Sequence, residues 1–78
     1  MRELLEVVAK ALVSKPNAVT VNEVQGETSL ILELKVDPED MGKVIGRQGR
    51  VAKAIRTVMR AAAARDGRRV TVDIVEHS

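Results

Sequence analysis

The apolar positions of this chain are spaced so that helical and strand patterns alternate along it. The first apolar residues recur at helical spacing, at Leu4, Leu5, Val8 and Leu12. This spacing predicts a helix over about residues 3–12. Pro16 lies shortly after the last of them, and proline together with its predecessor resists helix continuation. We therefore expect the first helix to end before Pro16.

Two segments with strand periodicity follow. Val19 and Val21 alternate with polar neighbours, which indicates a strand. From Leu30 to Val36 every even-numbered residue is apolar, which predicts the clearest strand of the chain. The residues between them include Gly26, a typical turn former. Together the two segments predict a β-hairpin.

The second half of the chain predicts two helices and a strand. Asp37 before Pro38 is typical of a helix start, and we interpret Asp37, Glu39 and Asp40 as helix-start residues. This helix is expected to end at Gly46, and the next to begin near Gly49. Six residues of the second helix recur at helical spacing and are expected to be buried: Val51, Ala54, Ile55, Val58, Met59 and Ala62. A polar loop over 66–69 leads to a final strand, at Val70, Val72 and Ile74.

Size and composition favour a single non-catalytic domain. Seventy-eight residues with 45% hydrophobic content suit one small core. The absence of cysteine excludes disulfides and thiolate metal sites. No apolar run approaches the roughly 20 residues that span a bilayer, and no signal-peptide block is present, so we expect a soluble cytoplasmic protein with no membrane partner. His77, the only histidine, is expected to be an ordinary tail residue.

The same composition limits the function. Lacking a nucleophile–base pair, a metal cluster and a cofactor loop, the chain is not expected to be an enzyme or to use a cofactor, a metal or a small-molecule substrate. Because Phe, Tyr and Trp are absent, RNA-binding modes that stack bases on aromatic rings are also excluded. A nucleic-acid site in this chain has to use charge, backbone amides, aliphatic contact and arginine planes.

Positive charge is concentrated in one window. Residues 41–65 contain no acid and seven of the thirteen Lys and Arg residues, which leaves six cations against eleven acids elsewhere. The net charge of +2 therefore combines +7 in this window with −5 in the remainder. Such an uneven distribution favours binding of a polyanion.

Two glycines lie inside this basic window. Gly46 and Gly49 bracket Arg47 and Gln48 at the junction of the two predicted helices. Without a Cβ, either glycine lets a sugar-phosphate backbone approach the main chain, and positive φ costs little there. The start of the second helix adds a dipole that favours an anion. The pattern predicts a phosphate-binding turn.

The segment from Val44 to Arg50, Val-Ile-Gly-Arg-Gln-Gly-Arg, resembles the GXXG loop of a KH domain. Such loops clamp about four nucleotides of single-stranded RNA by their backbone. The element order α-β-β-α-α-β resembles the type II (bacterial) KH fold, an α+β fold. The resemblance implies a three-stranded mixed sheet with three helices on one face. It covers residues 1–78 as one KH domain, with a core strand-helix-helix-strand unit over about 29–76.

A stand-alone domain of this length is similar to the small bacterial single-KH-domain RNA-binding proteins, the KhpA family. That resemblance implies a non-catalytic single-stranded RNA binder, an RNA chaperone or post-transcriptional regulator. It also implies a homodimer or a heteromer with a second KH-containing protein.

The resemblance assigns roles to particular residues. Phosphates would be held by Gly46, Arg47, Gln48 and Gly49. Neighbouring charge would come from Lys43, Arg50 and Lys53, and from Arg68 and Arg69 in the variable loop. Bases would lie in an aliphatic groove with Val44 and Ile45 on one wall and the final strand opposite. Taken alone, Ile45 is a core residue more often than a groove residue.

Three other interpretations remain open from the residues alone. The glycine turn could simply connect two helices. Two helices around a turn also resemble a helix-turn-helix that binds duplex DNA. Finally, the strand from Leu30 to Val36 and the alanine run over 61–64 could be contact surfaces of a protein–protein assembly module.

Overall fold

A computed structural model describes residues 1–76, except for the side chain of Arg47. His77, expected to be a tail residue, lies outside the described residues. The elements are α1 (Arg2–Leu12), a short 3-10 helix η1 (Pro16–Ala18), β1 (Thr20–Gln25), β2 (Ser29–Val36), α2 (Pro38–Arg65) and β3 (Arg69–Glu76).

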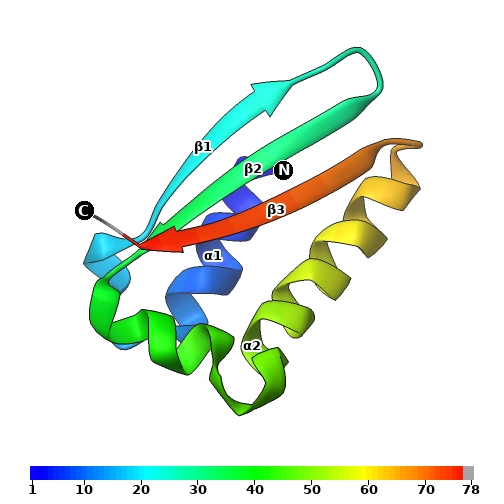
Figure 1. Cartoon of the computed structure of the whole chain (residues 1–78). Coiled ribbons are helices and arrows are strands. Elements are labelled where there is room, and N and C mark those ends of the chain that lie inside the picture. Colours follow the sequence, from blue (N-terminus) through cyan, green and yellow to red (C-terminus); the bar gives the residue numbers. More distant parts are fainter. Residues whose placement is uncertain (77–78) are drawn as a thin grey trace.

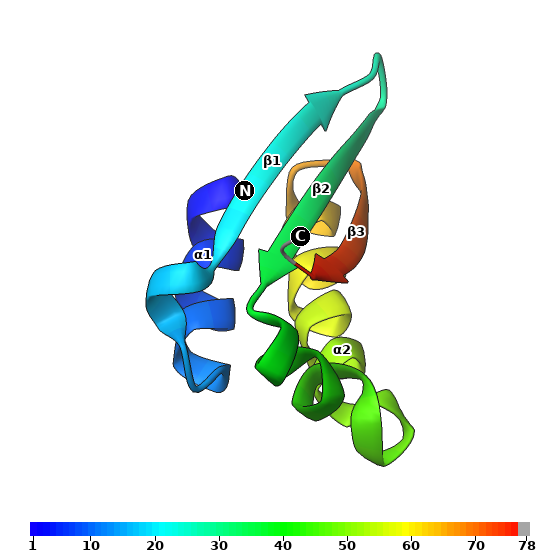
Figure 2. The ribbon, with the colours of Figure 1, turned by 60° about the vertical axis from the view of Figure 1, so that its left-hand side comes forward.

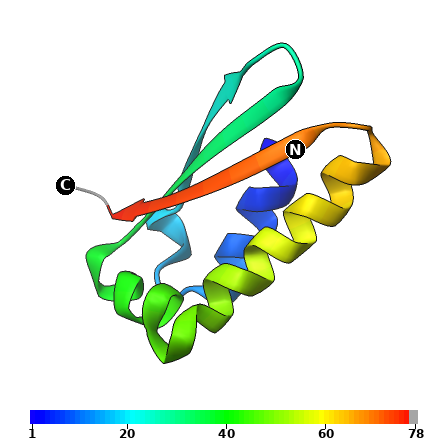
Figure 3. The ribbon, with the colours of Figure 1, turned by 45° about the vertical axis from the view of Figure 1, so that its right-hand side comes forward.

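The three strands form one mixed sheet in the order β1-β2-β3. β1 pairs antiparallel with β2 through the predicted hairpin, whereas β2 and β3 are parallel, with Leu32 opposite Val72. The parallel pair requires a crossover connection, which α2 provides. Figures 1 and 3 show α1 and α2 covering the same face of the sheet. The other face is uncovered, so the fold has two layers.

α2 is sharply bent and consists of two arms. Gln48 and Gly49 have φ values of 63° and 69°, in the left-handed region, within an otherwise right-handed helix. The bend divides α2 into a first arm over 38–47 and a second over 50–65, seen as a sharp change of direction in Figures 1 and 2. With the arms as separate helices, the predicted order α-β-β-α-α-β and the α+β fold are confirmed. The break lies after Gly46, where the sequence placed it, and Gly46 has no positive φ.

Local signals at the ends of α2 act as expected. Asp37 Oδ1 accepts the N–H of Glu39 at 2.9 Å, an N-cap bond. At the other end Gly67 has a φ of 67°, and the Arg68 N–H bonds the Ala63 carbonyl at 3.0 Å. This is the Schellman arrangement, in which a left-handed glycine lets the chain satisfy the last helical carbonyls. It turns the chain directly into β3.

The hydrophobic core lies between the sheet and the helices. Leu30, Leu32, Leu34 and Val36 of β2 point into it and are almost fully buried. Because these side chains are buried in the core, they are not available to another protein, and the interpretation of this strand as a protein contact surface is wrong. The core comprises Leu5, Ala9, Val13, Val19, Val21, Leu30, Leu32, Leu34, Val36, Val44, Ala52, Ile55, Met59 and Val72.

The buried stripe of the second arm differs from the expected one. Ile55 and Met59 are buried as predicted, but Ala54 and Val58 are exposed, Val58 by 41%. Ala52 and Ala63 are buried in their place. Small side chains at these two positions allow the arm to approach the sheet closely, which rotates its buried face away from the larger Val58.

Candidate nucleic-acid interface

The bend of α2 is an open feature at the end of the molecule opposite the β1–β2 hairpin (Figure 1). Gln48 is exposed, and Gly46 and Gly49 are half-buried. A Cβ built on either glycine would have no heavy atom within 4 Å outside its own helical neighbourhood. The main chain at the bend is therefore accessible to a ligand from outside.

The backbone conformation requires glycine at one of these two positions and not at the other. Gly49 has a positive φ, a conformation that any L-residue adopts only at a cost. Gly46 has neither a positive φ nor a crowding neighbour, so nothing within the described chain requires glycine there. Glycine inside a helix costs stability relative to alanine. The described fold therefore gives no reason for glycine at residue 46.

Apart from Arg47, whose side chain is not described, the cations of residues 41–65 are free of ion pairs within the described residues. The salt bridges of the structure are Arg2 with Glu6, Lys15 with Asp37 and Glu39, and Lys35 with Glu33. None involves a described cation of the basic window. On the second arm Lys53, Arg56 and Arg60 are spaced so that they share one flank, and Arg56 and Arg60 of this flank face β3. Uncompensated charge on one flank favours an anionic ligand.

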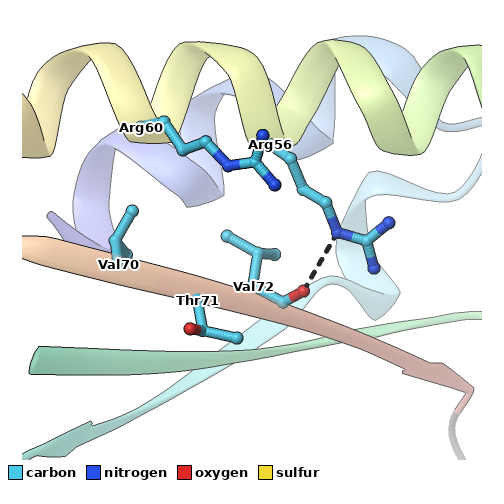
Figure 4. A pocket seen from close by; sticks show the side chains of 5 residues that line it. All are labelled: Arg56, Arg60, Val70, Thr71 and Val72. Carbon is cyan, nitrogen blue, oxygen red and sulfur yellow. Dashed lines mark hydrogen bonds between the residues drawn. The ribbon is translucent and has the colours of Figure 1, made fainter.

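Arg56 bonds one carbonyl of β3, the edge strand of the sheet. Its Nε donates a hydrogen bond to the Val72 carbonyl at 3.3 Å, and the side chain is half-buried. Figure 4 shows Arg56 and Arg60 extending from the second arm toward β3. They line a hollow of about 90 Å³ together with Val70, Thr71 and Val72. This contact was not predictable from the sequence, because the spacing of Arg56 alone is that of an ordinary solvated cation.

Lys43 lies away from the second arm, where the first arm of α2 meets the segment that follows α1. Its Nζ donates to the Ser14 hydroxyl at 3.4 Å, next to Asp40. Asp40 is only 2% exposed, and its carboxylate accepts the backbone N–H groups of Ser14 and Lys15, each at 3.0 Å. The bond from Ser14 is the main cause that lowers the pKa of Asp40, with a contribution from the positive charge of Lys43, against the opposing effect of burial. Part of the charge of Lys43 is therefore used inside the protein.

Val44 and Ile45, both expected on the groove wall, face different sides of the first arm. Val44 is completely buried, so its assignment to a groove wall is wrong. Ile45 is 53% exposed, so the preference for a core position is wrong there too. On a helix, neighbouring residues face different sides, and the first arm turns Val44 to the core. Ile45 is thus available to a ligand next to the bend.

Arg50, Lys53, Arg68 and Arg69 are all exposed. Arg68 and Arg69 lie with Arg60 around a second, shallower hollow beside β3. Exposed cations therefore extend from the bend along the second arm to the start of β3. Within residues 1–76 no cluster of His, Cys, Asp and Glu has the makings of a metal site. None of the helices described is both long and apolar enough to cross a membrane.

Comparison with known proteins adds close relatives. A family model described as KhpA/KhpB, KH domain, matches residues 2–74. A protein of Clostridium perfringens named RNA-binding protein KhpA is 65% identical over 75 residues, 96% of this chain and 100% of that protein. The corresponding proteins of Clostridium acetobutylicum and Aquifex aeolicus are 64% and 43% identical, over 96% and 97% of this chain and 100% and 96% of theirs.

Two solved structures share the fold. One is a variant of Aquifex aeolicus Era bound to GDP and aluminium fluoride, with a TM-score of 0.66. The other is Era in complex with MgGDPNP and nucleotides 1506-1542 of 16S ribosomal RNA, with a TM-score of 0.67. Each is 22% identical to this chain, over 96% of it and 29% of the Era chain. The likeness shows the fold.

These findings agree with the sequence. The expectation of a non-catalytic protein is confirmed by the relatives, which are binding proteins by name. Both the family match and the full-length relatives coincide with the resemblance carried by the segment from Val44 to Arg50. This chain belongs to the KhpA/KhpB family of KH domains.

Proposed function

We propose that this protein binds single-stranded RNA, with the bend of α2 holding the sugar-phosphate backbone. The observation that carries the proposal is Gly46: its φ is not positive and a Cβ there would enter open space. A phosphate passing close to the main chain gives this glycine a reason that the fold does not. The names of the relatives support the same ligand.

Phosphate binding at the bend would combine three sources of attraction. The main chain at Gly46 and Gly49 is accessible, Gln48 between them is exposed, and the second arm presents the positive end of its dipole there. Arg50 and Lys53 add exposed charge on the first turns of that arm. Lys43 contributes charge that it shares with Asp40. Backbone contacts of this kind hold a strand without reading its sequence.

The bases would lie between the first arm and β3. Ile45 offers exposed aliphatic surface on the helical side. The opposite wall would be the free edge of β3, whose backbone groups are not paired with another strand. In a chain without aromatic residues, aliphatic contact and guanidinium planes take the place of stacking rings.

One such groove is short, and its contacts are mostly to the backbone. We therefore propose a role as an RNA chaperone or post-transcriptional regulator in the cytoplasm, one that binds many RNAs with modest affinity. Pairing of two copies, or pairing with a second KH-containing protein, would raise the affinity through avidity.

An exposed apolar strip on the second arm supports pairing. Ala54, Val58 and Ala61 recur at helical spacing and are all exposed, on a flank distinct from that of Lys53. We expect Val58→Lys to reduce self-association, measured by light scattering at several concentrations. The isolated domain should still bind RNA, more weakly.

The double variant Arg47→Asp with Gln48→Asp tests the central proposal. It places two negative charges on the exposed bend, and aspartate tolerates the left-handed conformation of residue 48. We expect RNA binding to be lost while circular dichroism and the melting temperature stay near those of the parent. Unchanged RNA affinity in this folded variant would disprove the proposal.

A matched control carries the same charge change at a distance. Arg2→Asp with Asn17→Asp alters the net charge equally, at exposed positions in α1 and η1. It should reduce affinity only slightly. Competition with duplex DNA in the same mobility assay separates the two nucleic acids, since a preference for the duplex would favour the helix-turn-helix interpretation.

A further inference from the structure

Arg56 is fixed against β3 by one of its donors, and its other donors are free. A guanidinium has five N–H donors and no acceptor. Only Nε is used, on the Val72 carbonyl, among the residues that the structure describes. Figure 4 shows the two terminal nitrogens directed away from Arg60. A half-buried, anchored guanidinium of this kind presents its remaining donors in a fixed direction.

The edge that Arg56 covers would otherwise present an acceptor. β3 is an edge strand, and residues on alternate positions direct their backbone groups to the free side. An open carbonyl at Val72 would accept from the amino groups of cytosine and adenine. With Arg56 bonded to that carbonyl, one of its two lone pairs is used and free N–H donors stand beside it. At Val72 the hydrogen-bonding character of the edge is thereby shifted from acceptor toward donor.

The neighbouring hollow has the same character. Its two charged side chains, Arg56 and Arg60, are both pure donors. Neither is paired with a carboxylate in the described part of the chain. The hollow of about 90 Å³ accommodates a few water molecules or the polar edge of a base rather than a whole nucleotide.

We propose, on the basis of the RNA-binding function proposed above, that Arg56 is a specificity-determining residue. It selects the keto bases uracil and guanine over the amino bases cytosine and adenine. Arginine donors match the O6 of guanine and the O4 of a uracil-type ring, whereas the amino group that cytosine carries at the position of O4 is itself a donor and repels them there. Arg56 follows Gly49 by seven residues, about 10 Å along the helix axis. This lies within the stretch of about four nucleotides that a KH loop clamps.

Uridine and cytidine provide a matched pair of ligands, since both are pyrimidines and differ in the donor and acceptor pattern of one edge. We would measure the affinity of the whole protein for oligouridylate and oligocytidylate of about eight nucleotides, twice the length that the loop clamps. Fluorescence anisotropy at fixed salt is suitable. We expect at least about fivefold tighter binding of oligouridylate, the low end of the discrimination found for one good base contact.

Two substitutions distinguish the effect of the fixed, forked guanidinium donors from the effect of positive charge alone. Arg56→Lys keeps the charge but not the anchored fork, and should retain most of the affinity while the preference for uridine falls at least by half. Arg56→Ala reopens the Val72 carbonyl and should bring the preference to parity or to cytidine. Arg65→Ala removes an equal charge from the second arm away from this hollow and should leave the ratio of the two affinities unchanged.

The outcomes distinguish this proposal from the one on which it rests. If the parent protein binds neither oligonucleotide, the proposed function itself is refuted. Equal binding of the two oligonucleotides by the parent, or a uridine preference that survives Arg56→Ala in a folded protein, would refute the role of Arg56 alone. An equal drop in both affinities in that variant would assign Arg56 to charge or stacking and also overturn the selection of keto bases.

Discussion

The carboxylate of Asp40 accepts the backbone N–H of Lys15 at 3.0 Å, across 25 positions of sequence. Its other oxygen accepts the N–H of Ser14. Asp40 is the only buried charged side chain among the described residues. It thus satisfies two amides after α1 and fastens the α1–η1 junction to the first arm of α2, the arm that leads to the bend.

This contact predicts a dependence of stability on acidity. The pKa of Asp40 is lowered in the folded protein, chiefly by the bond from Ser14, so the unfolded chain takes up this proton more readily. Its stabilising contribution is therefore complete above the unfolded value of about 4 and is lost as pH falls through the folded value. Denaturant unfolding from pH 7 down to about pH 2 should show this loss.

Asp40→Asn identifies the group responsible. An amide places N–H donors opposite one of the two backbone N–H groups, so we expect the melting temperature at pH 7 to fall by on the order of 10 °C. The difference between parent and variant should shrink at low pH. Glu39→Gln, one residue away but exposed, is the control and should change the melting temperature little. A constant difference at all pH values would show that Asp40 is not the titrating group.

Features encoded by neighbouring residues were predictable from the sequence. The hairpin, the cap at Asp37 and the glycine after α2 depend on residues a few positions apart, whose chemistry decides the backbone conformation directly. The segment that we propose to bind phosphates belongs to the same class, since its glycines and cations are adjacent. Such local signals are the basis on which both the order of elements and the family could be predicted.

Features that depend on tertiary packing were not predictable. Ala54 and Ala63 are chemically identical, yet one is exposed and the other buried, because the approach of the second arm to the sheet selects the face. Because the residues at the bend are left-handed, the two arms do not form one continuous helix. The helical spacing of buried positions in the first arm therefore cannot be continued into the second. The bonds of Asp40 to Lys15 and of Arg56 to Val72 join residues 25 and 16 positions apart and leave no local signal.

The glycines of the bend should respond differently to alanine. Gly49→Ala imposes a left-handed alanine and should cost about 1–2 kcal/mol. Gly46→Ala removes a helical glycine in open space and should stabilise the fold by about 0.5–1 kcal/mol. RNA affinity should nevertheless fall about tenfold in Gly46→Ala, as a new methyl group prevents close approach of the backbone. Denaturation and mobility-shift titrations measure the two effects, and tight binding by Gly46→Ala would argue against phosphate contact at this residue.

Gln48 carries strain that glycine would relieve. Its φ of 63° is unfavourable for a residue with a Cβ and no short side chain to bond locally. Gln48→Gly should therefore raise the free energy of unfolding by about 1 kcal/mol. Gln48→Ala retains the same backbone cost and serves as the control, with little change expected. Similar stabilities for the two variants in urea titrations would indicate that residue 48 is not held in the left-handed region.

Salt should weaken RNA binding to a degree that counts the phosphates at the interface. If about three to five phosphates are neutralised, the plot of log K against log salt should have a slope of roughly −2 to −3.5 for a single strand. Lys53→Gln removes one exposed cation beside the bend and should lower the magnitude of this slope by about 0.7. Lys10→Gln, an exposed cation on α1, should leave the slope unchanged. A slope near zero in the parent protein would mean that aliphatic contacts at Ile45 and β3, rather than phosphates at the bend, provide the affinity.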